Sequence, residues 1–409
     1  MNTKSKDCFF SVPAHLILLD FEVPYDIYIN SSTHESRDKF VRIFKSGGIL
    51  AKHEVKEFLE KYFQLYIPEE QRSSYLLSLV KNENATDKQK TEVIKDSAIK
   101  YLDKLFDENT EFTTEILTEA IKGCRDSVES MVDVIQDKSV NDVRELIGNL
   151  SFHDFYTYDH SINVSMYNIA TLKVLKPNAS RREMVHAGLG GMLHDLGKIR
   201  IPTAILNHPG KLSDDEFAKI KQHPHYGGEI IEAQIMTNAF EDIDIDFGIV
   251  KRVVLEHHEN YNGTGYPKGL EGNQIHVLAR ITAISDFFDA LTTKRSYHEV
   301  VTIDEAIRIM SRSVGKKLDG KLFDIFVNKV SKGAIIERAT VELPDEFDPC
   351  QPQNVLPFQK VQANKQASNI FGDKKPQEFG KIKTQEDLFN ARNENDQEAK
   401  DKKSKKKVS

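Results

Sequence analysis

The sequence predicts a multi-domain protein: a small α+β domain, then an all-α helical bundle, then a largely disordered tail. Three observations support this fold class. Strand-like runs alternate with helical spacing only within residues 8–80, the apolar pattern of residues 86–335 is mostly helical, and Gln, Asn, Lys, Asp and Glu dominate beyond Pro344. At 409 residues the chain is long enough for two or three domains, each with its own core.

Domain boundaries are predicted where these patterns change. We assign residues 1–83 to an α+β regulatory or sensory domain, 84–149 to a helical linker, 150–340 to the helical domain and 341–409 to the tail. The tail is polar and rich in lysine near its end. Such a composition cannot bury enough apolar surface to offset the entropy of ordering, so we expect disorder there.

The N-terminal domain has short apolar segments separated by turn-forming residues. Residues 16–19, 27–29 and 64–67 have the composition of strands, and residues 41–44 form another short apolar run. Apolar positions within residues 55–62 recur at helical spacing. The alternation predicts a small α+β domain.

Residues 86–150 have a helical pattern throughout. One apolar stripe recurs at spacings of three and four; it comprises Phe112, Ile116, Ala120, Cys124, Val128, Met131 and Ile135. The simpler interpretation is a core-facing helix that joins two domains. A helix that forms a homodimer or carries a signal is the alternative, since apolar stripes are common to both.

Composition excludes several classes of protein. The net charge of −7 argues against general nucleic-acid binding as the main function, and no specific nucleic-acid partner is expected. Cys8, Cys124 and Cys350 are scattered, which indicates a reducing compartment without a disulfide framework. No apolar run reaches the roughly 18 residues of a transmembrane helix, and no signal peptide is evident at the N-terminus. We therefore expect a cytoplasmic protein.

The segment from Gly191 to Pro202 contains an adjacent His194 and Asp195. Its apolar spacing places the pair near the buried C-terminal end of a helix, which Gly197 would end. Burying either side chain without a partner is costly. Adjacent positions diverge by about 100° around a helix, yet the pair can serve one centre if the aspartate bridges two metals. The simpler alternative is a capping aspartate beside a core histidine.

Further potential ligands occur in other segments with helical patterns. They are His160, His223, His257, His258 and Asp286. Any one of them could be a core polar group with a satisfied hydrogen bond. Seven such residues across five predicted helices are better explained by a shared metal site.

These motifs resemble those of the HD-GYP family, metal-dependent phosphohydrolases of the HD-domain type that degrade cyclic di-GMP in bacteria. The resemblance extends over about residues 150–335. It is carried by His194-Asp195-Leu196-Gly197-Lys198-Ile199 and by His257-His258-Glu259-Asn260-Tyr261-Asn262-Gly263-Thr264-Gly265-Tyr266-Pro267, with His160-Ser161, Pro209-Gly210-Lys211-Leu212, His223-Pro224, Ala279-Arg280-Ile281 and Asp286-Phe287-Phe288-Asp289-Ala290-Leu291-Thr292 in matching order.

The resemblance implies an HD-type bundle that holds a metal centre. The implied ligands are His160, His194, Asp195, His223, His257, His258 and Asp286. If Asp195 bridges two six-coordinate metals, these seven side chains and a bridging hydroxide fill all but two of the coordination positions. The two that remain are available to phosphate oxygens. Nitrogen and oxygen ligands without thiolate favour iron or manganese over zinc, nickel or magnesium. Some family members bind a third metal through a glutamate, but Tyr156 occupies that position here, so we expect two metals.

The resemblance also implies residues that contact substrate. Lys198 corresponds to a catalytic lysine on the scissile phosphate, although a surface lysine at a helix end is the alternative. Arg295 would grip the second phosphate, and His298 replaces a lysine common in the family, which weakens that grip. Tyr266 either contacts a base or braces its loop.

The predicted function is hydrolysis of cyclic di-GMP to pGpG, GMP or both, through a metal-bridged hydroxide and under control of the N-terminal domain. Two alternatives remain: a cyclic-dinucleotide receptor or interaction module with little turnover, and a phosphodiesterase for another cyclic dinucleotide such as cyclic GMP-AMP. Expected partners are cyclic di-GMP, signalling proteins and a second copy bound through residues 86–150.

Overall fold

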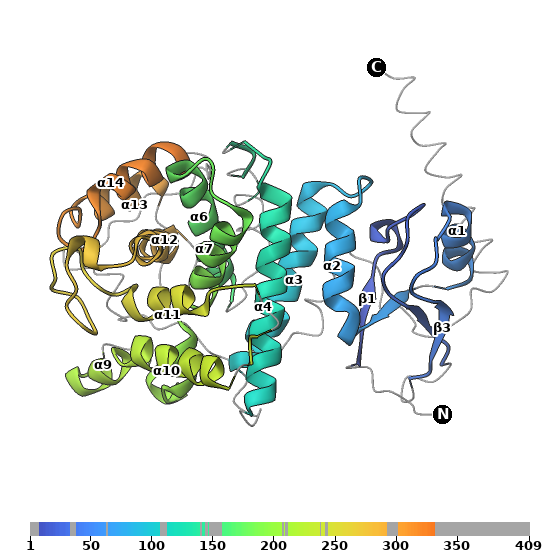
Figure 1. Cartoon of the computed structure of the whole chain (residues 1–409), viewed down its shortest axis with the longest axis horizontal. Coiled ribbons are helices and arrows are strands. Elements are labelled where there is room, and N and C mark those ends of the chain that lie inside the picture. Colours follow the sequence, from blue (N-terminus) through green and yellow to red (C-terminus); the bar gives the residue numbers. More distant parts are fainter. Residues whose placement is uncertain are drawn as a thin grey trace, which may run out of the picture. The chain divides into compact units, whose positions relative to one another are not determined.

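The computed structural model divides the chain into two compact units (Figure 1). One unit ends at Thr86 and the other begins at Asp87. The structure describes residues 8–32, 38–62, 64–106, 113–139, 141–143, 146, 158–206, 208, 212–237, 239–241, 244–292 and 302–331. Several predictions fall outside these residues, namely those for Phe112, Tyr156, residues 209–211, Arg295, His298, Cys350 and the tail 341–409.

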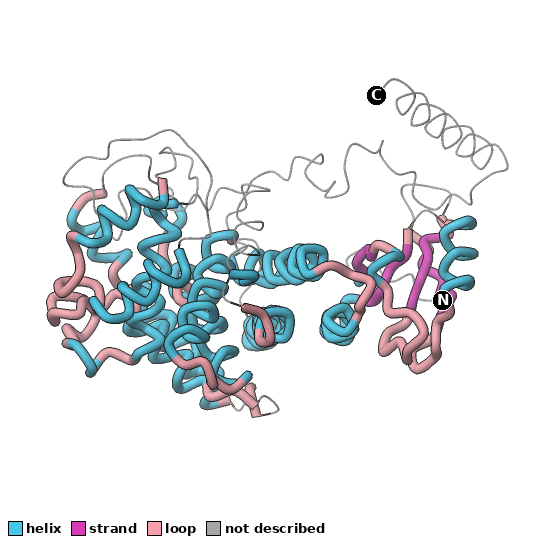
Figure 2. Tube along the Cα trace, turned by 90° about the horizontal axis from the view of Figure 1, so that it is seen from above, coloured by secondary structure: helices cyan, strands magenta, loops and turns pink. Residues whose placement is uncertain are grey.

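The N-terminal unit is built on one antiparallel sheet, whose strands are magenta in Figure 2. The strand order is β1-β4-β2-β3, in which β1 pairs with β4 and β2 pairs with both β3 and β4. The elements are β1 (Phe9–Val12), β2 (Ile27–Asn30), β3 (Phe40–Phe44), α1 (Lys52–Lys61), β4 (Leu65–Pro68) and α2 (Arg72–Lys81). Tyr25, Ile27, Ile67 and Tyr75 are fully buried in its core. The predicted small α+β domain is confirmed.

The strand predicted at residues 16–19 is wrong. Ala14–Leu16 forms a 3₁₀ turn, and the first strand is β1, paired in register with β4. Leu16, Ile17 and Leu18 are nevertheless buried. A run of three or four apolar residues indicates burial without distinguishing a strand from a packed turn.

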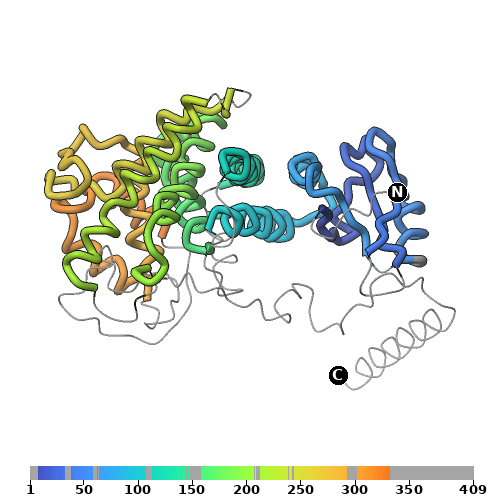
Figure 3. Tube along the Cα trace, turned by 90° about the horizontal axis from the view of Figure 1, so that it is seen from below, coloured from blue at the N-terminus to red at the C-terminus, as the bar shows by residue number. Residues whose placement is uncertain are grey.

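Two helices occupy most of residues 86–150, where the sequence predicts a helical pattern throughout. They are α3 (Asp87–Phe106) and α4 (Thr114–Ile135), and Thr113 caps α4 by accepting a hydrogen bond from the Ile116 amide at 3.3 Å. Helices α3 and α4 pack side by side (Figure 3), and α4 also contacts α7. The described part of the apolar stripe is buried from Ala120 to Ile135 within this chain, as the core-facing interpretation requires. A homodimer stays a prediction.

The rest of the second unit is mostly helical, as predicted. Its helices are α6 (Asp159–Leu175), α7 (Arg181–Leu193), α8 (Thr203–Leu206), α9 (Asp214–Ile220), α10 (His223–Met236), α11 (Phe247–Glu256), α12 (Val277–Thr292), α13 (Ile303–Ser311) and α14 (Gly320–Ile325). Helix α12, which Figure 1 shows almost end-on, contacts α6, α7, α11, α13 and α14. Among the helices that the structure describes, none is both long and apolar enough to cross a bilayer.

Candidate metal centre

The structure brings all seven predicted ligands together in two groups. The first group is Asp195, His223, His257 and His258, and the second is His160, His194 and Asp286. Within each group, one potential ligand atom per residue lies within 4.8 Å of the others. The groups are assembled from the ends of α7 and α11, the first turns of α6 and α10, and the interior of α12.

Asp195 is placed by a sharp change of helix type. Helix α7 ends at Leu193, four residues before the predicted end at Gly197, and a 3₁₀ turn, Leu196–Arg200, follows. Gly197 serves a close backbone approach instead: a Cβ there would lie 1.9 Å from the main-chain oxygen of His223. The first turn of α10 can therefore lie directly against this 3₁₀ turn, which brings His223 to Asp195.

Asp195 connects the two groups. Its Oδ1 lies 3.3 Å from His223 Nε2, and its Oδ2 lies 3.3 Å from His194 Nε2 and 2.6 Å from Lys198 Nζ. One carboxylate thus faces one histidine from each group while remaining only 5% exposed. A carboxylate in this position can bridge two metal ions, one in each group.

Three histidines are held by main-chain carbonyls three residues before them. The pairs are His194 Nδ1 with Gly191 at 2.7 Å, His223 Nδ1 with Ile220 at 2.8 Å, and His257 Nδ1 with Val254 at 2.8 Å. A carbonyl oxygen can only accept, so Nδ1 carries the proton in each ring. Each Nε2 then presents a lone pair, which is how a histidine ligand is usually oriented toward a metal.

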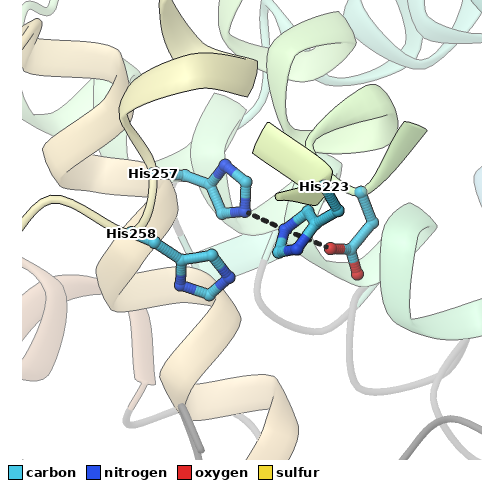
Figure 4. Close-up of side chains that lie close together, drawn as sticks. His223, His257 and His258 are labelled. Carbon is cyan, nitrogen blue, oxygen red and sulfur yellow. Dashed lines mark hydrogen bonds and ion pairs between the residues drawn. The ribbon is translucent and has the colours of Figure 1, made fainter. Parts of the chain in front are cut away.

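The imidazoles of the first group favour the neutral state. Burial lowers the pKa of His223 to about 3 and that of His257 to about 4, and it holds the pKa of His258 well below its usual value. The Nε2 atoms of His223 and His257 nevertheless lie only 3.2 Å apart, as the dashed line in Figure 4 marks. Two facing lone pairs without a proton repel, and a bound cation would remove that repulsion.

The remaining donors also fit a metal. His194 Nε2 is buried and has no hydrogen-bond partner among the described residues. Burial alone would raise the pKa of Asp195, but charge interactions with His194 and Lys198 outweigh it and hold that pKa well below its usual value. For Asp286, burial is likewise outweighed, chiefly by the hydrogen bond from His160, and its pKa is also depressed. Ionised carboxylates and imidazole nitrogens form a suitable donor set for a divalent cation.

Two predicted substrate-contacting residues, Lys198 and Tyr266, lie at the edge of this centre, and the third, Arg295, is outside the described residues. Lys198 has its side chain 17% exposed and forms an ion pair with Asp195. The Tyr266 ring stacks on the His258 ring, with centroids 4.9 Å apart, and the Tyr266 amide donates to the His258 carbonyl oxygen at 3.1 Å. Tyr266 therefore braces its loop against a potential ligand, while base contact remains a prediction.

The sequence analysis missed three supporting residues, Glu259, Asp289 and Asn163. Glu259 is 3% exposed and accepts from the amides of Lys268 and Leu270 at 2.7 and 3.0 Å, which holds together the loop after His258. Asp289 contacts His160 and Asn163. The available signal was a second carboxylate three residues after Asp286 in an apolar helix, where burial requires a partner.

Comparison with known proteins agrees with this geometry. Residues 155–322 match the family model of the HD domain. The cyclic di-GMP phosphodiesterase PA4108 of Pseudomonas aeruginosa is 41% identical over 182 residues, or 44% of this chain and 41% of that protein. The cyclic di-GMP phosphodiesterase response regulator RpfG of Xanthomonas campestris is 38% identical over 159 residues, or 39% and 40% of the two chains. The 3'3'-cGAMP-specific phosphodiesterase 3 of Vibrio cholerae is 31% identical over 192 residues, or 47% and 37%.

The matched segments span about two-fifths of the length of these curated relatives. The HD-domain match at residues 155–322 falls within the part of the chain whose motifs carried the resemblance, and that resemblance is confirmed. The ligand roles of the individual residues remain predictions, which the grouping of their donor atoms supports.

Proposed function

We propose that this chain, whose residues 155–322 match the HD domain and whose motifs resemble the HD-GYP family, is a metal-dependent phosphodiesterase that hydrolyses cyclic di-GMP. One observation carries the proposal: seven donor side chains converge in two groups, with Asp195 facing a histidine of each. Two of the relatives described above are cyclic di-GMP phosphodiesterases, which supports the choice of substrate.

The proposed centre binds two divalent ions, iron or manganese, one in each group. When bound, such ions supply an activated water and neutralise phosphate charge. Asp195 would bridge, and the three main-chain carbonyls fix His194, His223 and His257 with Nε2 directed into the centre. These hydrogen bonds restrict rotation of the three rings before metal binds.

Lys198 is proposed to contact the scissile phosphate. In the structure its ammonium group lies on Asp195 Oδ2. If bound metals occupy the oxygens of Asp195, the lysine is free to pair with an anionic substrate at the same edge of the site. Hydrolysis of one phosphodiester yields pGpG, and a second hydrolysis yields GMP.

A mixed cyclic dinucleotide is the second candidate substrate. The relative from Vibrio cholerae is named as specific for 3'3'-cGAMP and matches over nearly half of this chain. A cyclic GMP-AMP ring presents the same pair of phosphodiesters to the metal centre. Discrimination would depend on base contacts such as the one predicted for Tyr266.

Regulation by the N-terminal unit is proposed to act through α3, which begins at Asp87 immediately after that unit ends. Lys95 of α3 forms a buried ion pair with Asp159, 3.1 Å apart, and Asp159 directly precedes His160. A shift of α3 would therefore act on the first turn of α6, which carries a proposed ligand.

A soluble bacterial second messenger is encountered in the cytoplasm, and we place the activity there.

The test compares cyclic di-GMP and cyclic GMP-AMP turnover by anaerobically purified protein loaded with iron or manganese. His223→Gln and His225→Gln form a matched pair, because His223 belongs to the first group whereas His225 is exposed and paired with Glu229. We expect His223→Gln and Asp195→Asn to lose bound metal and turnover, and His225→Gln to keep both. Two bound metals with turnover of neither dinucleotide would instead favour a receptor.

A further inference from the structure

Asp289 occupies a distinctive place beside the metal centre. Its side chain is 1% exposed, and both of its oxygens are used. Oδ2 lies 2.7 Å from His160 Nδ1, and Oδ1 accepts a hydrogen bond from Asn163 Nδ2 at 2.9 Å. A buried carboxylate held at both oxygens has a fixed orientation and can fix the ring that it contacts.

His160 differs from His194, His223 and His257 in how its ring is held. His194, His223 and His257 donate from Nδ1 to carbonyls of their own preceding turn. His160 is only the second residue of α6 and instead contacts a side chain from α12. Its orientation therefore depends on a residue that mutation can change.

Helix α12 contacts both nitrogens of this ring. Asp286 Oδ1 lies 3.1 Å from His160 Nε2, and Asp289, three residues later on the same helical face, lies against Nδ1. A carboxylate on Nδ1 directs Nε2 toward a metal and makes it a stronger donor than a neutral carbonyl would. The arrangement thus distinguishes one histidine of the second group from those of the first.

We propose that Asp289 is a positioning residue that holds His160 as a ligand and selectively strengthens metal binding at the group of His160, His194 and Asp286. This inference rests on the metal centre of the proposed function. It does not depend on which cyclic dinucleotide is hydrolysed. Asn163 assists by fixing the second oxygen of Asp289.

The test is a calorimetric titration of the full chain with Mn²⁺ after chelation, comparing wild type with Asp289→Asn. Asp319→Asn is the matched control, because Asp319 is also buried and charged but pairs with Arg280 at 2.6 Å and caps α14. We expect Asp289→Asn to lower the affinity for one of two bound Mn²⁺ ions by about 10- to 100-fold and to leave the affinity for the other unchanged. Asp319→Asn should bind both ions as wild type does.

A double-mutant cycle separates positioning from general stability. If Asp289 acts through His160, Asp289→Asn should cause no further loss of Mn²⁺ affinity in a His160→Ala background. Three results would overturn the proposal: additive losses of Mn²⁺ affinity in the double mutant, an equal loss of affinity at both sites in Asp289→Asn, or wild-type affinity in Asp289→Asn. A wild-type chain that binds two Mn²⁺ ions but hydrolyses no cyclic dinucleotide would refute the proposed function alone, whereas a chain that binds no Mn²⁺ would refute both.

Discussion

The close contact at Gly197 predicts that one added methyl group will disrupt the metal centre more than the fold. In Gly197→Ala, the Cβ would lie 1.9 Å from the His223 carbonyl oxygen and 2.5 Å from the Gly227 nitrogen. Both neighbours are main-chain atoms, so no side chain can rotate away. The 3₁₀ turn after Asp195 and the first turn of α10 must therefore separate.

The size of the required shift follows from the geometry. Ordinary van der Waals contact begins at 3.4 Å, so the closest approach must open from 1.9 Å by about 1.5 Å. Overpacking of this kind costs about 1–3 kcal/mol of folding free energy, which a domain of this size can tolerate. Metal ligands tolerate only about 0.2 Å, and His223 Nε2 now lies 3.3 Å from Asp195 Oδ1. We therefore expect the variant to fold and to lose the metal of the first group.

The assay pairs thermal unfolding with Mn²⁺ titration for wild type, Gly197→Ala and Gly320→Ala. Gly320 is the control, since a Cβ there would lie 3.2 Å from a Val314 methyl group that can move. We expect a modestly lowered melting temperature and a lost Mn²⁺ site in Gly197→Ala only. Wild-type Mn²⁺ affinity in Gly197→Ala would refute the claim that this contact sets the distance between His223 and Asp195.

Three other perturbations test the fold and the centre. Lys173 Nζ donates to the carbonyls of Ile135, Gln136 and Lys138 at 2.8, 2.6 and 2.5 Å, so Lys173→Met should lower the free energy of unfolding in urea by about 1–3 kcal/mol. Lys176→Met, which removes only an exposed ion pair with Glu183, should cost less than about 1 kcal/mol. Because burial depresses the folded-state pKa of His223 to about 3 and of His257 to about 4, the unfolded chain binds more protons below pH 6.5. Stability of the metal-free protein should therefore fall from pH 6.5 toward pH 4 by up to about 1.4 kcal/mol per pH unit for each histidine, and a constant melting temperature between pH 7 and pH 5 would contradict this. Mn²⁺ at about 100 times its dissociation constant should stabilise the folded chain by about 2.7 kcal/mol, and Asp195→Asn should reduce that gain in a melting experiment.

The candidate site was largely predictable because charged and polar side chains are costly to bury unless they share a binding partner such as a metal ion. His194, Asp195 and Asp286 stand among apolar residues at helical spacing, where an isolated charge would be unfavourable. That pattern indicated a shared site, and the family resemblance implied the seven ligands; neither predicted their division into two groups, which depends on how five helices pack. The position of the helix end also escaped prediction. Gly197 was taken as a stop signal, whereas it allows two backbones to approach each other.

The missed features depend on partners that are distant in sequence. Asp289 meets His160 across 129 positions, and no local pattern encodes that contact. In the N-terminal unit, β1 is defined by its hydrogen-bonded pairing with β4. The more apolar segment 16–19 is largely buried but is not part of a described strand. Periodicity reports which side of an element is buried, and it does not report what lies against that side.

On the proposed function, the ion pair between Lys198 and Asp195 would link metal loading to substrate binding. Without metal, Asp195 is a buried carboxylate, and the ammonium group 2.6 Å away offsets the cost of burying its charge. If Asp195 holds metal as proposed, its carboxylate would no longer need the ammonium group of Lys198 as its counter-charge. The lysine would then be an uncompensated cation at the edge of a cationic centre, where a phosphodiester is the complementary partner. Under that proposal, Lys198 would stabilise the metal-free fold through Asp195 and would contribute to an anion site once the metals are bound.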